Sequence, residues 1–136
     1  MYTAYRLAEI SDIERIVQID DLRRSEQISN AVRNGDCFVA EVSAQVVGFA
    51  IMDYTFFGCG FIKLLVIAKE CRRQGVGSLM IESLSIQCKT EKLFTSTNES
   101  NAPMRKLLSK TGFVPCGQID ALDEGDIELF YVRRKT

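Results

Sequence analysis

The stretch FIKLLVIAKECRRQGVGSLMIESL, residues 61–84, determines how this chain folds. Residues 61–67 are apolar apart from Lys63, which is typical of a buried strand. Residues 72–77 follow with glycines at positions 75 and 77, and the apolar residues after them recur at helical spacing. The pattern predicts a strand, a glycine-containing turn and a helix. Because the first turn of a helix exposes unpaired N–H groups and a partial positive charge, this turn is a candidate anion site.

Patterns outside this stretch predict the other elements of one domain spanning residues 1–136. Short turns between successive strands favour antiparallel pairing, whereas the strands on either side of the helix that begins near Val76 are expected to be parallel. We therefore predict a mixed α/β (α+β) fold, with a mostly antiparallel sheet of about seven strands and helices on both faces. In chain order, the expected elements are a strand at 2–8, helices at 11–24 (with a capping box at 11–14) and 26–33, strands at 37–42, 46–54 and 61–67, a helix at 76–87, a strand at 93–97, a helix at 104–111, and strands at 113–119 and 127–133.

Composition and charge argue against several classes of protein. The 136 residues carry a net charge of −1, so no overall field favours nucleic acid or an anionic membrane. Histidine is absent and the five cysteines include no C-x-x-C pair, so a metal site is not expected. No apolar run approaches the roughly 18 residues of a membrane span, and the first residues lack the features of a signal peptide. We expect a cytoplasmic protein with reduced thiols and with no metal, nucleic-acid or membrane partner.

Three phosphate-binding motifs compete for the turn at residues 72–77. A dinucleotide fingerprint, G-x-G-x-x-G, needs glycine at position 80, which is Met80 here. A P-loop needs G-x-x-x-x-G-K-S/T, and the chain contains no such string. The pattern that remains is Arg72-x-x-Gly75-x-Gly77 after a strand.

This pattern resembles the acyl-CoA-binding motif Q/R-x-x-G-x-G/A of the GNAT superfamily of N-acetyltransferases. Residues 65–80 are similar to the family across strand, turn and helix, and residues 100–113, SNAPMRKLLSKTGF, resemble its second motif, N…LYEKLGF. The order of the elements is similar too. The resemblance implies a GNAT-like fold and an enzyme that transfers an acetyl group from acetyl-CoA to a primary amine, by direct attack in a ternary complex.

Two other interpretations stay open. A degenerate module would bind acyl-CoA and act as a sensor or scaffold without catalysis. A different nucleotide-binding fold would bind ATP or NADH instead. The acceptor is expected to be an amine-bearing molecule of unknown identity, and the chain to be a monomer or a homodimer.

The resemblance also implies which residues bind the cosubstrate. Backbone N–H groups of residues 73–78 would hold the CoA pyrophosphate, with charge from the two preceding arginines. The strand edge at residues 65–67 would hydrogen-bond the pantetheine arm, and an N–H near Val66 would stabilise the oxyanion. In full, the implied cofactor residues are Leu65, Val66, Ile67, Arg72, Arg73, Gln74, Gly75, Val76, Gly77, Ser78, Asn101, Met104 and Leu107.

Some of these residues also have ordinary structural explanations. Asn101 is a suitable helix cap. Met104 and Leu107 fit a helix core, and Arg73 and Gln74 fit a solvated turn.

The catalytic groups are less well defined, because the chain departs from the family pattern at two positions. Where some relatives carry a strand glutamate, this chain has residues 60–63, GFIK, so the general base is unassigned. Where many carry a tyrosine that protonates the CoA thiolate, it has Leu108, although a thiol with a pKa of about 8.5 leaves without much help. The candidates are Asp53, Glu128, Asp20 and Asp21 as a base acting through water, and Tyr54 and Tyr131 as the acid.

An acidic group lies near the last expected turn. It comprises Asp120, Asp123, Glu124, Asp126 and Glu128. A solvent-exposed turn explains such a composition. The alternative is that some of these carboxylates attract a cationic amine substrate.

Overall fold

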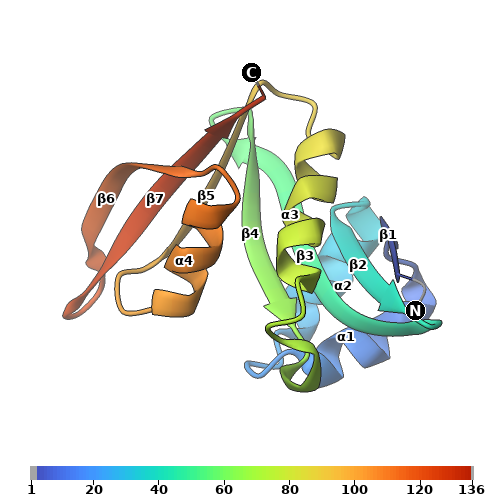
Figure 1. Cartoon of the computed structure of the whole chain (residues 1–136). Coiled ribbons are helices and arrows are strands. Elements are labelled where there is room, and N and C mark those ends of the chain that lie inside the picture. Colours follow the sequence, from blue (N-terminus) through green and yellow to red (C-terminus); the bar gives the residue numbers. More distant parts are fainter. Residues whose placement is uncertain (1–2, 136) are drawn as a thin grey trace.

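Seven strands join in a single sheet on which the helices pack (Figure 1). The computed structural model describes residues 3–135, so the expected strand residue Tyr2 lies outside the described part. In chain order the elements are β1 (Thr3–Leu7), the 3₁₀ turn η1 (Ile10–Asp12), α1 (Ile13–Ile19), α2 (Ser25–Asn34), β2 (Cys37–Val42), β3 (Gln45–Phe56), β4 (Cys59–Ile67), the 3₁₀ turn η2 (Lys69–Cys71), α3 (Val76–Gln87), β5 (Lys92–Asn98), α4 (Ala102–Lys110), β6 (Val114–Asp123) and β7 (Asp126–Arg134).

The sheet has the order β1-β2-β3-β4-β5-β7-β6. Every neighbouring pair is antiparallel except β4 and β5, which flank α3 and run parallel. This confirms the expected mixed, mostly antiparallel sheet. The parallel pairing is short, because only Gly60–Ile62 of β4 pairs with Leu93–Thr95 of β5. The two strands therefore meet at one end only.

Helices cover both faces of the sheet and form two apolar cores. Figure 1 shows α3 and α4 on the near face, with α1 and α2 behind the sheet. The core under α3 and α4 includes Ala50, Ile62 and Leu84, and the core under α1 and α2 includes Ile16 and Phe49. Because β3 lies between both cores, residues 46–52 are buried on either face, which explains their nearly continuous apolar run.

The first long helix is shorter than the sequence predicts. The structure ends α1 at Ile19, not near Arg24, because the carboxylate of Asp20 accepts hydrogen bonds from the backbone N–H groups of Leu22 and Arg24 and holds a loop there. The predicted capping box at residues 11–14 is also wrong. The N–H of Glu9 donates to Asp12 at 2.7 Å, and a 3₁₀ turn precedes the helix.

Tight turns make several strands longer than predicted. Phe56 pairs with Cys59, so the β3–β4 turn is only Phe57-Gly58, with φ values of +54° and +75°. Asp123 pairs with Asp126, which reduces the expected seven-residue loop to residues 124–125. Two positive φ values are typical of a type I′ turn, which Asn-Gly signals more clearly than Phe-Gly.

One negative finding concerns membranes. Within residues 3–135, no helix combines the length and the apolar character needed to cross one.

Candidate functional site

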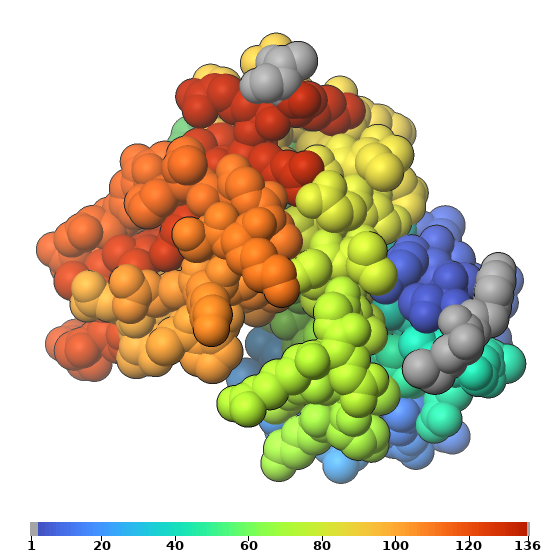
Figure 2. All heavy atoms as spheres, viewed as in Figure 1, coloured from blue at the N-terminus to red at the C-terminus, as the bar shows by residue number. Residues whose placement is uncertain are grey.

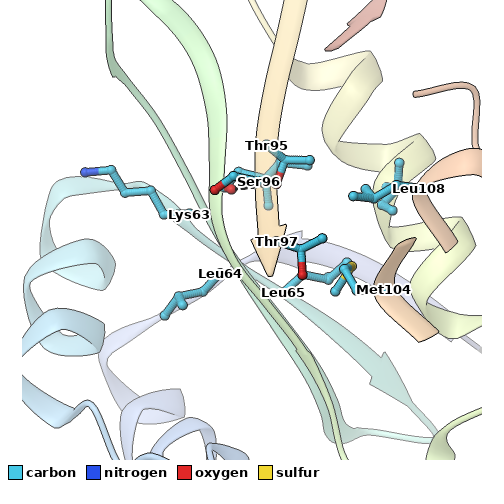
Figure 3. A pocket seen from close by; sticks show the side chains of 10 residues that line it. Lys63, Leu64, Leu65, Thr95, Ser96, Thr97, Met104 and Leu108 are labelled. Carbon is cyan, nitrogen blue, oxygen red and sulfur yellow. Dashed lines mark hydrogen bonds between the residues drawn. The ribbon is translucent and has the colours of Figure 1, made fainter. Parts of the chain in front are cut away.

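The site begins where β4 and β5 separate. Beyond the pair Ile62 and Thr95, β4 stays paired with β3, and β5 stays paired with β7, so the two strands diverge. A cleft opens between them under α3 and α4. It is lined by Ile62, Lys63, Leu64, Leu65, Ile81, Thr95, Ser96, Thr97, Met104 and Leu108, several of which Figure 3 labels.

A β-bulge marks the closed end of this cleft. Ile51 lies opposite Leu64 but Met52 lies opposite Ile62, so Lys63 is an extra residue in β4. Figure 3 shows its side chain directed away from Leu65 and from the α4 side of the cleft. Bulges bend a strand and redirect its side chains, and they are common beside active sites. The bulge therefore helps to separate β4 from β5.

The free edge of β4 faces the cleft. The N–H of Ala68 donates to Val47 on β3 at 2.8 Å. Because backbone groups alternate in direction along a strand, the N–H of Val66 also faces β3, whereas those of Leu65 and Ile67 face the cleft. The sequence places the oxyanion donor near Val66, and the pairing makes Leu65 and Ile67 the available amides in that segment.

The turn before α3 presents a run of free backbone donors. Within residues 3–135, the amides from Arg73 to Ser78 donate no hydrogen bond to a protein acceptor, and the first helical bond runs from Leu79 to the carbonyl of Gly75. Gly75 adopts a left-handed conformation, with φ of +85°, as the residue before the helix. These six consecutive amides are free to bind an anion, as the sequence predicts for this turn, and the binding itself stays a prediction.

Arg72 links this turn to the end of β4. Its Nε donates to the carbonyl of Ile67 at 2.9 Å, and its guanidinium lies 3.9 Å from the carboxylate of Asp21. Gln74 makes one long hydrogen bond to the carbonyl of Glu70. The positive charge of Arg72 is thus held where the cleft meets the turn. Figure 2 shows a hollow in the surface between this turn, in yellow-green, and α4, in orange.

Close packing joins α3, α4 and the end of β4. A Cβ placed on Gly77 would lie 3.2 Å from Leu107 and 3.9 Å from Ile67. Leu107 and Met104 are half-buried against the core under α3 and α4, and Met104 also lines the cleft. The structure thus gives both residues a packing role. Their contact with a cofactor stays a prediction.

Asn101 has a structural role of its own. It caps α4, and its Oδ1 accepts a hydrogen bond from the N–H of Met104 at 3.2 Å. Within the described chain, its side-chain NH₂ has no hydrogen-bond partner. That group is still available to a ligand.

Asp53 forms an ion pair beside the bulge. Lys63 Nζ lies 2.8 Å from its carboxylate, and the N–H and hydroxyl of Thr55 donate to it at 3.2 and 2.9 Å. Burial raises the pKa of Asp53, but the hydrogen bonds from Lys63 and Thr55 outweigh burial and hold that pKa below its ordinary value. Asp53 is therefore a weak base.

The structure does not bring the other catalytic candidates together. Glu128 accepts a hydrogen bond from Asn98 at 3.1 Å, at the end of β5. Tyr131 is buried in the core under α3 and α4. The Tyr54 hydroxyl accepts from the N–H of Lys89, just after α3. Neither tyrosine is among the described residues that line the cleft, whereas Leu108 is.

The two other candidate bases are held by arginines. Asp20 is buried against Arg24. Asp21 is mostly exposed and lies near Arg72. Among residues 3–135, no three histidine, cysteine, aspartate or glutamate side chains are grouped as a metal site requires.

Sequence reasoning named Leu65 and Met104 among the residues of the cleft but missed most of the others, including two polar ones. Thr97 lines it from β5, and Lys63 lies at its closed end. The alternation of leucine and threonines at 93, 95 and 97 is a usable signal for Thr97, because it places all three on one face. The bulge at Lys63 depends on the register against β3, which the local sequence does not specify.

Comparison with known proteins supports one family. Residues 4–113 match the model of the acetyltransferase (GNAT) family. The crystal structure of a GNAT-family acetyltransferase from Bacillus cereus ATCC 10987 is 32% identical in sequence and superposes with a TM-score of 0.93. The match covers 100% of this chain and 99% of the Bacillus cereus chain. No curated protein matches at a significant level.

More distant structures share the fold. A provisional streptothricin acetyltransferase from Bacillus anthracis str. Ames, solved with acetyl coenzyme A, is 17% identical over 100% of both chains, with a TM-score of 0.87. A ribosomal-protein-alanine N-acetyltransferase from Brucella melitensis is 20% identical over 96% of this chain and 99% of its own, with a TM-score of 0.80. With the family match over most of its length, and the free amides and the cleft in place, this chain belongs to the GNAT family of acetyltransferases.

Proposed function

We propose that this acetyltransferase transfers the acetyl group of acetyl-CoA to a primary amine, which attacks the thioester directly in a ternary complex. The observation that carries the proposal is the run of six free amides, Arg73 to Ser78, next to a cleft with an open strand edge. The amides suit a pyrophosphate, and the edge suits an extended arm that bears amide groups.

The cosubstrate is proposed to extend from the turn into the cleft. The pyrophosphate binds the amides before α3, near the charge of Arg72. The pantetheine arm follows β4 as an added strand and bonds to the groups of Ile67 and Leu65 that face the cleft. The thioester then reaches the bulge at Lys63, where an amide of this edge stabilises the oxyanion of the tetrahedral intermediate.

The acceptor is proposed to meet the thioester in the cleft. It attacks as a neutral amine, so its proton must first pass to a base. The hydrogen-bonded Asp53 is poorly suited to take that proton alone, and we assign it to water held by Asp53 or Glu128.

A thermal-shift screen with acetyl-CoA, ATP and NADH tests the donor. A ligand at 100 times its Kd adds about 2.7 kcal/mol to the free energy of unfolding, and we expect this only for acetyl-CoA and CoA. Stabilisation by ATP or NADH alone would point to a different nucleotide-binding function. No shift with any CoA ester would overturn the proposal.

Thiol release tests the transfer. Acetyl-CoA is mixed with the protein and a panel of primary amines, and free CoA is measured with a thiol reagent. Amine-dependent release supports the enzyme. Tight binding of acetyl-CoA without release would instead support the acyl-CoA sensor or scaffold.

The acidic group near the β6–β7 turn gives a test of the acceptor. Asp126 binds Ser100 and Asp123 binds Asn98, so both also fix the start of α4 and the end of β5. Glu124 has no hydrogen-bond partner within residues 3–135 and is exposed, so Glu124→Gln removes charge alone. If these carboxylates attract a cationic amine, KM for the amine rises while KM for acetyl-CoA stays constant. An unchanged KM for the amine would indicate that these carboxylates only belong to a solvent-exposed turn.

A further inference from the structure

Two threonines on β5 differ in a way that points to a ligand. Thr95 and Thr97 lie on the same face of the strand and are 6% and 7% exposed. The Thr95 hydroxyl donates to the carbonyl of Ile62 at 2.9 Å and closes the end of the cleft. The Thr97 hydroxyl has no hydrogen-bond partner among the described residues. Figure 3 shows its oxygen directed into the cleft, toward Leu65 and Met104.

The Thr97 oxygen is open to the cleft, because the one fully buried side-chain polar atom without a hydrogen-bond partner among the described residues is the Tyr5 hydroxyl. A group that enters the cleft can therefore reach this oxygen. The neighbours of Thr97 in the cleft are apolar side chains, including Met104 and Leu108. Valine has nearly the same shape and would fill this space without a polar group, so packing alone does not account for the hydroxyl.

We propose that Thr97 donates a hydrogen bond to the sulfur of CoA as it leaves. This inference rests on the proposed function, which places the pantetheine arm along β4 at Leu65. In many GNAT enzymes a tyrosine hydroxyl protonates the sulfur of CoA as it leaves. The matching position here is Leu108, which lines the same cleft. Thr97 brings a free hydroxyl into that cleft from the facing strand, on the side of Met104 and Leu108 (Figure 3). Ser96 also lines the cleft, but it lies on the opposite face of β5 and points toward the Lys63 side.

The step balances without a proton from Thr97. The amine nitrogen forms a bond to the thioester carbon, the tetrahedral intermediate collapses, and the carbon–sulfur bond breaks. The bonding electron pair goes to sulfur, which leaves as a thiolate, and the nitrogen loses its proton to water. An alcohol is a far weaker acid than a thiol with a pKa of about 8.5, so Thr97 keeps its proton and donates a hydrogen bond only. A hydrogen bond to a charged acceptor is stronger than one to a neutral group.

The ionisation of bound CoA tests this inference without turnover. The thiolate absorbs near 240 nm, and its titration is followed as the difference between the CoA complex and the desulfo-CoA complex, which cancels the protein's own cysteines. We expect Thr97→Val to raise the pKa of the bound thiol by about one unit, a tenfold change in its ionisation. Thr97→Ser, which keeps a hydroxyl, should hold it at the wild-type value.

Thr111→Val is the matched control. It removes a hydroxyl that is as buried as that of Thr97, but this one is bonded to the carbonyl of Leu107 and lies outside the residues that line the cleft. It should lower the melting temperature and leave the pKa of the bound thiol unchanged. The kinetic counterpart is a kcat about tenfold lower in Thr97→Val, with KM for acetyl-CoA unchanged and kcat restored in Thr97→Ser.

The outcomes separate this inference from the function on which it rests. If wild-type protein binds CoA but Thr97→Val leaves the pKa of the thiol unchanged, the role of Thr97 is refuted and the proposed function stands. Equal losses in Thr97→Val and Thr97→Ser would also refute it. If the wild-type protein does not bind CoA, the role of Thr97 and the proposed function are both refuted.

Discussion

At the scale of the residue, Asp20 shows how one buried charge shapes the chain. Its carboxylate is 1% exposed and accepts hydrogen bonds from the Arg24 guanidinium at 2.7 and 3.0 Å. It also accepts from the backbone N–H groups of Leu22 and Arg24. These bonds end α1 and fold the loop before α2. The hydrogen bond from Arg24 holds the pKa of Asp20 below its ordinary value, against the opposing effect of burial.

Asp20→Asn should therefore lower the free energy of unfolding at pH 7, by about 2 kcal/mol. A lowered pKa in the folded state means that the carboxylate stabilises the fold fully above the ordinary carboxyl pKa of about 3.9 and loses this effect as pH falls through the folded value. The difference between wild type and variant should then be constant near neutral pH and shrink in acid. Urea denaturation at several pH values measures it, with the exposed Asp21→Asn as a control near zero. A difference that grows in acid would contradict this account.

At the scale of the element, the β3–β4 turn carries an energetic cost. Phe57 has a φ of +54° and is 90% exposed, although a bulky residue in the left-handed region is strained. Its ring packs edge-to-face with that of Phe56, at a centroid distance of 5.0 Å. Asparagine adopts this conformation readily, and Asn-Gly is the preferred type I′ pair.

We expect Phe57→Asn to raise the free energy of unfolding by about 0.5 kcal/mol. Thermal or urea denaturation measures the change. Phe57→Val, which places a β-branched residue at the same φ, is the matched control and should lower the free energy of unfolding. A loss of stability in Phe57→Asn would mean that the ring makes a contact worth more than the backbone strain.

The N-terminus of α3 gives a second prediction at this scale. Ser78 is in the first turn of the helix and half-buried, so aspartate there interacts favourably with the helix dipole but repels a pyrophosphate. Ser78→Asp should keep or raise the stability of the free protein and weaken CoA binding at least tenfold. Ser78→Asn, of the same size and without charge, is the control. Calorimetric titration with CoA compares them, and equal affinities would contradict the placing of the pyrophosphate.

Local sequence was sufficient to locate the elements and the turn with free amides. Apolar periodicity located all seven strands and the helices, and the spacing of Gly75 and Gly77 identified the turn with free amides. Local sequence was insufficient where distant residues decide the outcome. The end of α1 depends on the side chain of Asp20, and the bulge at Lys63 depends on the register of β3. Whether Glu128 and Tyr131 line the cleft likewise depends on the strand order, which is decided by distant pairings.

At the scale of the whole molecule, the sheet consists of two parts that meet along a short seam. Strands β1 to β4 form one part and β5 to β7 the other, and the pairing of Gly60–Ile62 with Leu93–Thr95 joins them. Beyond Ile62, the edge of β4 is open on its β5 side. A ligand that pairs with this edge takes the place of the missing strand and links the anion site to the seam.

This arrangement predicts an alternating pattern of amide protection along β4. The N–H of Val66 faces β3 and should exchange slowly in the free protein, because it is already hydrogen-bonded. The N–H groups of Leu65 and Ile67 face the cleft and should exchange faster. Acetyl-CoA should slow exchange at Leu65, Ile67 or both by more than tenfold and change Val66 far less, since only the cleft side gains a partner. Hydrogen exchange followed by NMR resolves the three amides. Equal protection of all three would indicate general stiffening by the ligand, whereas protection limited to Leu65 and Ile67 requires that the pantetheine arm pairs with this edge.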